Sequence, residues 1–124
     1  MAAPGYPDAT TPVHAASANG AASAITATMP AVPGKINYLT GFEITSGGAT
    51  AASLVDVTIT GIAGGTLTYV LGVVAGATAA NAPLLVEFTK PVPASDQNIA
   101  ITVNVPSLGA GNTKARAVIH GFNK

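Results

Sequence analysis

Apolar and polar side chains alternate along Val55-Asp56-Val57-Thr58-Ile59-Thr60, so Val55, Val57 and Ile59 point to one side of the chain and their neighbours to the other. This period of two is typical of a half-buried β-strand. The same alternation recurs within 65–74, 83–89 and 98–105, and β-branched residues are common throughout. We therefore expect antiparallel sheets, each with one buried face and one exposed face.

The sequence predicts seven strands, separated by segments rich in Gly, Pro, Ser and Asn. Their expected bounds are 24–30, 36–45, 53–60, 65–74, 83–89, 98–105 and 113–122. Strands at this spacing, with no stretch of helical period, predict an all-β domain that forms an antiparallel β-sandwich or a jelly-roll-like fold. The predicted core consists of Val55, Val57, Ile59, Leu67, Val86, Phe88, Ile101, Val103 and Ile119.

Residues 1–22 differ from the rest, because small residues and prolines predominate there and no period appears. Such a segment buries little by itself, so we interpret it as an extended, flexible N-terminal arm that precedes a single β-sandwich domain at 23–124. Whether this arm folds back over the domain stays open. Its bulkiest or stiffest members, Tyr6, Pro7 and Val13, are candidate contacts to a partner. The first residues lack the basic and apolar regions of a signal peptide.

Charge is scarce: 8% of the 124 residues are charged, with five Lys or Arg against five Asp or Glu. A soluble monomer usually has about 25–35% charged residues on its surface and a net charge away from zero. A neutral surface promotes association, so we expect a homo-oligomer whose surface lies largely against other protein. Cysteine is absent, which excludes disulfides and thiolate metal sites. The weakly charged stretch 44–86 is broken by glycines and Pro83, so we expect no membrane-spanning helix.

Few residues could support catalysis. Glu43, Asp56 and Glu87 are expected in mid-strand on outer faces, without the pairing across about 5–9 Å that glycosidases use. The two histidines, His14 and His120, form no His-x-His or His-Glu motif, so the usual donors of a zinc or iron site are missing. We expect a protein that is not an enzyme and that needs no cofactor or metal.

The densest basic feature is the end of the chain, where Lys114, Arg116 and His120 share one face of the expected last strand. Nucleic-acid-binding domains are usually basic, whereas the isoelectric point of this chain is about 6.7. We therefore expect no nucleic acid as partner. These three residues are candidates for contact with an acidic patch of a protein partner, or for a solubilising role on an edge strand.

Four strand and turn phrases carry a resemblance: Leu39–Thr45, Ala52–Gly61, Pro83–Pro91 and Gly111–Phe122. They resemble small virion proteins of tailed bacteriophages, over roughly residues 36–122. Proteins of this type include capsid decoration, or cement, proteins, which have jelly-roll-like folds and sit on the phage head in many copies. The resemblance implies a structural virion protein that is made in the host cytoplasm, binds the major capsid protein on the capsid surface and stabilises the shell. It implies a homo-trimer, with a dimer as second choice.

Two other classes of function stay open. A receptor- or glycan-binding β-sandwich module of a phage tail or cell surface would favour exposed aromatic loop tips, whereas the loops here are rich in Gly and Ala and the chain has no Trp. A small hydrolase on a β scaffold would need more histidines and paired acids than this sequence contains.

Overall fold

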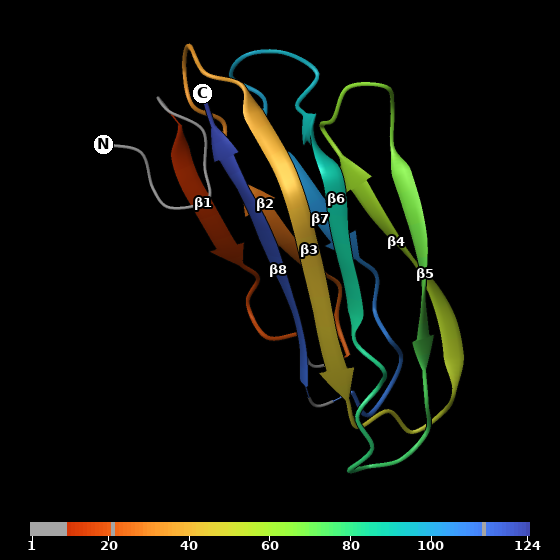
Figure 1. Cartoon of the computed structure of the whole chain (residues 1–124). Helices are drawn as coiled ribbons and strands as arrows, with labels where there is room; N and C mark the ends of the chain where they lie inside the picture. Colours follow the sequence, from red (N-terminus) through yellow and green to blue (C-terminus); the bar gives the residue numbers. More distant parts are fainter. Residues whose placement is uncertain (1–9, 21, 113) are drawn as a thin grey trace.

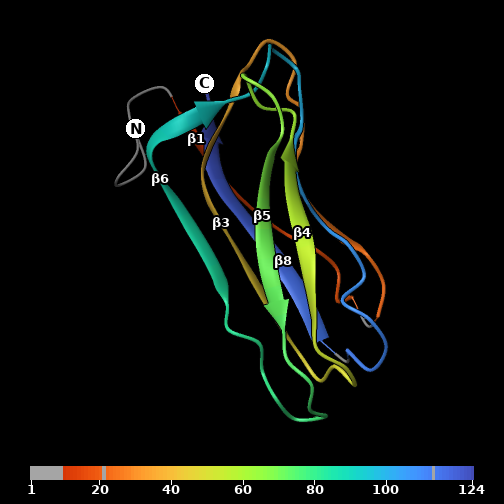
Figure 2. The ribbon, with the colours of Figure 1, turned by 90° about the vertical axis from the view of Figure 1, so that its right-hand side faces the viewer.

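The computed structural model describes residues 10–20, 22–112 and 114–124, and in them eight strands form two sheets that pack face to face (Figures 1 and 2). The strands are β1 (Thr11–Ala16), β2 (Ile25–Met29), β3 (Asn37–Gly47), β4 (Ser53–Thr60), β5 (Leu67–Val73), β6 (Leu84–Pro93), β7 (Ile101–Val105) and β8 (Lys114–Asn123). One sheet, called sheet A, has the strand order β1-β8-β3-β6, and sheet B has the order β2-β7-β4-β5. The predicted antiparallel β-sandwich is confirmed.

The strand pairing is nested. The first strand pairs with the last, β2 with β7, β3 with β6 and β4 with β5, always antiparallel. Only the β4–β5 connection stays within one sheet, and every other pair of consecutive strands lies in opposite sheets. No helix in the described residues is long and apolar enough to cross a membrane.

The core lies between the sheets, where the alternating apolar side chains of both inner faces meet. In β7, for example, Ile101 and Val103 are fully buried. Of the predicted core, Val57, Ile59, Ile101, Val103 and Ile119 are buried, and Val55, Val86 and Phe88 are half-buried against it. The prediction for Leu67 is wrong, because its side chain is 37% exposed. Leu67 begins β5, an edge strand that pairs only with β4, so little of the sheet surrounds it.

All seven predicted strands are present. β4 has its predicted bounds, whereas β6 continues past residue 89 to Pro93 and β7 begins at Ile101 rather than at 98. The largest difference lies in the predicted arm. Its segment Thr11–Ala16 forms β1, an added edge strand of sheet A that pairs with β8.

The predicted boundary between arm and domain, at residues 22 and 23, lies too far along the chain. The strand β1 is part of the predicted arm, but it belongs to the sandwich. Val13 and Ala15 pack against the core. Beyond β1, the amide of Ser17 donates to the carbonyl of Ala117 at 2.8 Å, and the amide of Gly20 donates to that of Ala115 at 2.9 Å. These bonds extend the contact with β8, which would otherwise be the edge of the sheet.

Two glycines in the central strands β3 and β8 let neighbouring strands of sheet A approach closely. A Cβ at Gly121 would lie 2.1 Å from the carbonyl oxygen of Tyr38, and one at Gly41 would lie 2.6 Å from that of Val86. Both distances are far below van der Waals contact, so a side chain at either position would force the backbones apart. The register of β3 also shifts between Leu39 and Gly41, which is a β-bulge.

Candidate interaction surfaces

The outer face of sheet A carries most of the ionisable side chains that lie in strands. The strands of sheet B contain a single charged residue, Asp56. By the alternation of burial, the outward side chains of sheet A include those of His14, Glu43, Glu87, Lys114, Arg116 and His120. The two outer faces therefore differ in chemistry although both belong to one small domain.

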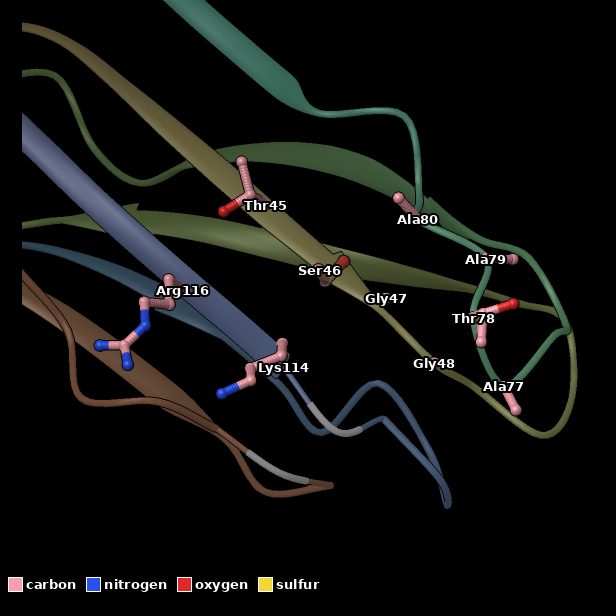
Figure 3. Close-up of a pocket in the computed structure, with 10 residues that line it drawn as sticks. All are labelled: Thr45, Ser46, Gly47, Gly48, Ala77, Thr78, Ala79, Ala80, Lys114 and Arg116. Atoms are coloured by element: carbon pink, nitrogen blue, oxygen red, sulfur yellow. The ribbon is translucent and has the colours of Figure 1, made fainter.

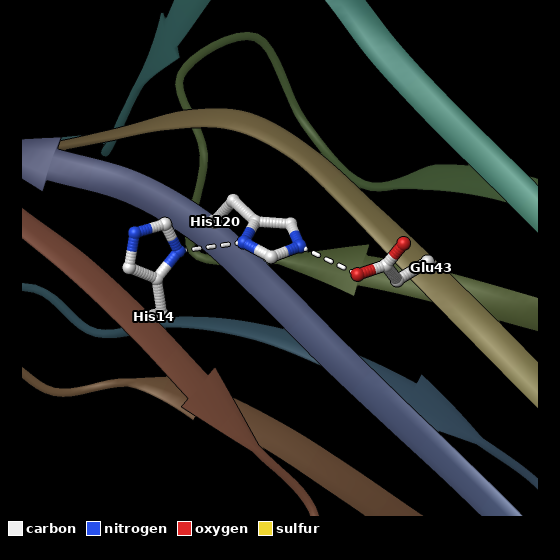
Figure 4. A network of polar contacts seen from close by, with 3 residues as sticks. All are labelled: His14, Glu43 and His120. Atoms are coloured by element: carbon white, nitrogen blue, oxygen red, sulfur yellow. Dashed lines mark hydrogen bonds and ion pairs between the residues drawn. The ribbon is translucent and has the colours of Figure 1, made fainter.

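A polar network crosses three strands of sheet A (Figure 4). The Nδ1 atoms of His14 and His120 lie 2.7 Å apart, and Nε2 of His120 lies 2.8 Å from Oε1 of Glu43. A neutral imidazole carries one N–H. If His120 donates its Nε2–H to the Glu43 carboxylate, its Nδ1 accepts a hydrogen bond from the Nδ1–H of His14. The network thus connects β1, β8 and β3.

The strand register explains why these residues meet. His14 is directly opposite His120, and His120 is opposite Gly41. From this position the imidazole of His120 reaches Glu43, which lies two residues along β3 from Gly41. The same residues, with Glu87 of β6, line a shallow hollow of about 780 Å³ on this face.

A second hollow, of about 450 Å³, lies at the other end of sheet A (Figure 3). Lys114 and Arg116 of β8 line one side, and the loop 77–80 lines the other. Within the described residues the only ion pair joins His120 to Glu43, so the ammonium of Lys114 and the guanidinium of Arg116 have no carboxylate partner there. Two exposed cations beside a hollow can bind an anionic group, such as a carboxylate of another protein.

The buried residue Asn81 holds the loop of this second hollow against β3. Its Nδ2 donates to Oγ of Ser46 at 2.6 Å, and its Oδ1 accepts from the amide of Val74 at 2.7 Å. Asn81 is 5% exposed; its bond to Ser46 is buried and its bond to Val74 is partly buried. Together with backbone hydrogen bonds between the loop and the end of β3, these two bonds set the position of the loop relative to Lys114.

Hydroxyl and amide side chains cover much of the outer face of sheet B. Asn104 Nδ2 donates to Thr102 Oγ1 at 3.1 Å, Thr26 Oγ1 donates to Asn104 Oδ1 at 3.3 Å, and the hydroxyls of Thr60 and Thr102 are hydrogen-bonded to each other. The first of these bonds lies within β7, whereas the other two cross between strands and link β2, β7 and β4. Towards β5 the face becomes apolar, since Leu54 is 78% exposed and Val70 is 59% exposed.

The structure separates the predicted contact residues. Tyr6 and Pro7 lie outside the described residues. Val13 is half-buried against the core of its own domain, so it is not available to a partner while β1 is part of the sheet. Lys114, Arg116 and His120 share one face of β8, as their spacing predicts. His120 is engaged by Glu43 and His14, whereas the two cations form no ion pair within the described residues.

The sequence does not predict the network of His14, His120 and Glu43, because it places His14 in the extended, flexible N-terminal arm. The signal that could have found it is the short alternation of Val13 and Ala15 with His14 and Ala16. In the described part of the chain, no three or more His, Cys, Asp or Glu side chains form a group that could hold a metal ion.

Comparison with known proteins does not identify a relative: the chain matches no protein-family model, and no match was found among curated proteins or among solved structures.

Proposed function

We propose that this protein is a structural virion protein of a tailed bacteriophage, which binds the outside of the capsid and stabilises the shell as a decoration protein. The observation that carries the proposal is the unequal distribution of charge. In a chain with 8% charged residues, one outer face displays two cations that form no ion pair with any described residue, and the strands of the other face have a single carboxylate. Surfaces of this kind are suited to lie against other protein.

The topology supports the proposal. The first strand pairs with the last, and the pairing continues inward to a single hairpin. This nested pairing supports the proposed jelly roll, an architecture that viral capsid domains use. This is also the finer fold that the resemblance to phage virion proteins implies.

In the proposed mechanism, Lys114 and Arg116 contact an acidic patch of the major capsid protein. One exposed ion pair contributes only about 0–1 kcal/mol, so a single contact of this kind would be weak. Many copies that each bridge neighbouring capsid subunits add their contributions through multivalency. A protein that binds the assembled shell but not its separated subunits stabilises the shell by mass action.

The segment 1–9 is proposed as a second part of the grip. It continues from β1, the edge strand of the sheet that carries Lys114 and Arg116. Tyr6 and Pro7 are its proposed anchors, because they are its bulky and stiff residues. An extended segment of this type can bind along an open sheet edge of a neighbour.

The test is co-sedimentation with undecorated phage heads. Arg116→Glu should weaken binding, because it places a carboxylate opposite the acidic patch. Lys35→Glu, which makes the same change in net charge outside the strands, should bind like the unaltered protein. Equal loss of binding in both variants would contradict a specific contact. If the unaltered protein does not bind heads, or labels the tail instead, the decoration function is wrong.

A further inference from the structure

Sheet B has two edge strands, β2 and β5, and neither contains a charged residue or a proline. The strand β5 (Leu67–Val73) is the longer of the two, and unlike β2 it exposes large apolar side chains, those of Leu67 and Val70. Natural proteins usually protect an exposed edge with charges, prolines or bulges, because the unpaired backbone groups can pair with another chain. The edge of sheet A on the same side has such protection in Glu87, Lys90 and Pro91, and β1 contains Pro12.

Apolar surface accumulates around the same edge, which faces the viewer in Figure 2. Among the described residues, the large apolar side chains that are exposed lie on β4, β5, β6 or directly after β5: Leu54, Leu67, Val70, Val74 and Leu85. β1 packs against β2 on the opposite side of the sandwich, whereas β5 and β6 make almost no contact. The inward-facing Tyr69, Val86 and Phe88 consequently stay half-buried.

We propose that β5 pairs antiparallel with the β5 of a second copy, across a two-fold axis, so that two copies of sheet B become one continuous sheet. Full overlap of Leu67–Val73 places Val70 opposite the same residue of the second copy. In this register Tyr69 lies opposite Leu71 and Leu67 lies opposite Val73, so inward apolar side chains meet inward apolar side chains. Backbone groups of both edges become hydrogen-bonded, and the open sides of the two sandwiches cover each other.

The absence of charge along β5 favours a second copy of this chain as its partner. At a two-fold axis each residue near the centre meets its own copy, so a charged residue there would repel itself. The edge strand has no charge along its whole length, and the chain as a whole has a formal net charge of zero. Of the two predicted oligomeric states, two-fold edge pairing selects the dimer.

The pairing has a consequence that rests on the proposed function. In a continuous sheet the inner faces of both halves point the same way, so both copies of sheet A lie on one side of the dimer. The two pairs of Lys114 and Arg116 then face in the same direction, and the dimer can engage a shell at two points. A second attachment is intramolecular and increases avidity without a new type of contact.

Disulfide trapping tests the pairing directly, because the chain contains no cysteine. Directly opposite residues of an antiparallel pair have Cα atoms roughly 4.5–5.5 Å apart, which a disulfide can span. Oxidised Val70→Cys should therefore form a covalent dimer, and Thr28→Cys on the opposite edge should not. Thr68→Cys should form little dimer alone, but should cross-link with Gly72→Cys when the two variants are mixed, which fixes the register.

A charge variant gives the second measurement. Val70→Lys keeps each copy folded, since the new ammonium lies opposite Asp56 of its own β4, but it brings two ammonium groups together at the axis. It should be monomeric in sedimentation equilibrium, whereas Thr28→Lys should remain dimeric. A monomeric mass for the unaltered protein, or no cross-linking of Val70→Cys, would overturn the inference.

Phage heads provide a third measurement with the Val70→Cys variant. If the introduced thiol reacts freely with a thiol reagent in solution and is protected only on heads, the edge belongs to the capsid protein and the inference is wrong. Disulfide trapping and sedimentation are measured without heads. A negative result in either therefore overturns the dimer alone, and binding to heads is decided by the co-sedimentation test.

Discussion

The outer faces of sheets A and B arise from the same alternation of side chains but carry different chemistry. The face of sheet A has the histidine network, two hollows, and Lys114 and Arg116 without an ion pair to any described residue. The face of sheet B has hydrogen-bonded threonines and Asn104, with an apolar border at β5. Alternation decides which side chains point outward, and their identity decides what the surface can bind. The difference suggests that sheet A meets the partner and the edge of sheet B meets a second copy.

The largest expected effect on the free energy of unfolding comes from a substitution in the core between the two sheets. Ile101→Ala removes a fully buried side chain and should lower the free energy of unfolding by about 2–5 kcal/mol. Thr102→Ala, one residue along, alters only the outer face of sheet B and should cost about 1 kcal/mol, because hydroxyl hydrogen bonds are lost. Urea unfolding measures both. Equal losses would show that the alternation does not separate the core from the outer face.

Asn81→Ala should have the next largest effect. It leaves the Val74 amide and the Ser46 hydroxyl without their partner, which costs about 1–3 kcal/mol for buried groups. Since Asn81 holds the loop beside Lys114, the variant should also bind heads more weakly. Thr78→Ala, on the exposed part of the same loop, is the control for both measurements. If the Asn81 variant is destabilised but binds heads normally, this loop takes no part in the contact with the capsid.

The histidine network should contribute less. Its side chains are partly exposed, 32% for His120 and 43% for Glu43, so water screens the contact. A double-mutant cycle of Glu43→Ala and His120→Ala should give a coupling energy of about 0.2–1 kcal/mol. The same cycle with Glu87→Ala, on the same face, should give a coupling near zero. Comparable coupling in the two cycles would mean that the face acts through its overall charge rather than through this contact.

Deletion of residues 2–9 should have the smallest effect on stability, because it leaves β1 and its pairing with β8 intact. The thermal midpoint should stay unchanged, while retention on heads should fall. Tyr6→Ala should reproduce part of the loss. Undiminished retention in both variants would remove residues 1–9 from the proposed grip and leave the contact to sheet A alone.

Much of the fold could be predicted from the sequence, because alternation is a local signal. Strand β4 has the bounds that its side chains predict, and the buried residues of β7 follow the period of two. Strand β1 was missed because Ala-rich and Pro-containing sequence resembles a linker, and its pairing depends on the distant β8. The side chain of Leu67 points inward as its alternation predicts, but it is exposed rather than buried. Its exposure depends on what lies beside the edge strand β5, which the alternation does not show.

The candidate site was less predictable than the fold. The spacing of Lys114, Arg116 and His120 correctly places them on one face. Their partners are set by register across strands: His14 lies opposite His120 only because β1 pairs with β8, and Glu43 lies within reach of His120 because β3 pairs with β8 on its other side. Spacing within one strand cannot show contacts of this kind.

Binding of the capsid by the outer face of sheet A is tested most directly by a cryo-electron microscopy reconstruction of undecorated heads mixed with the protein. We expect added density on the outside of the shell, with β8 and its Lys114 and Arg116 against an acidic surface of the capsid protein. Density that places the threonine face of sheet B against the shell, or a shell without added density, would contradict capsid binding through sheet A.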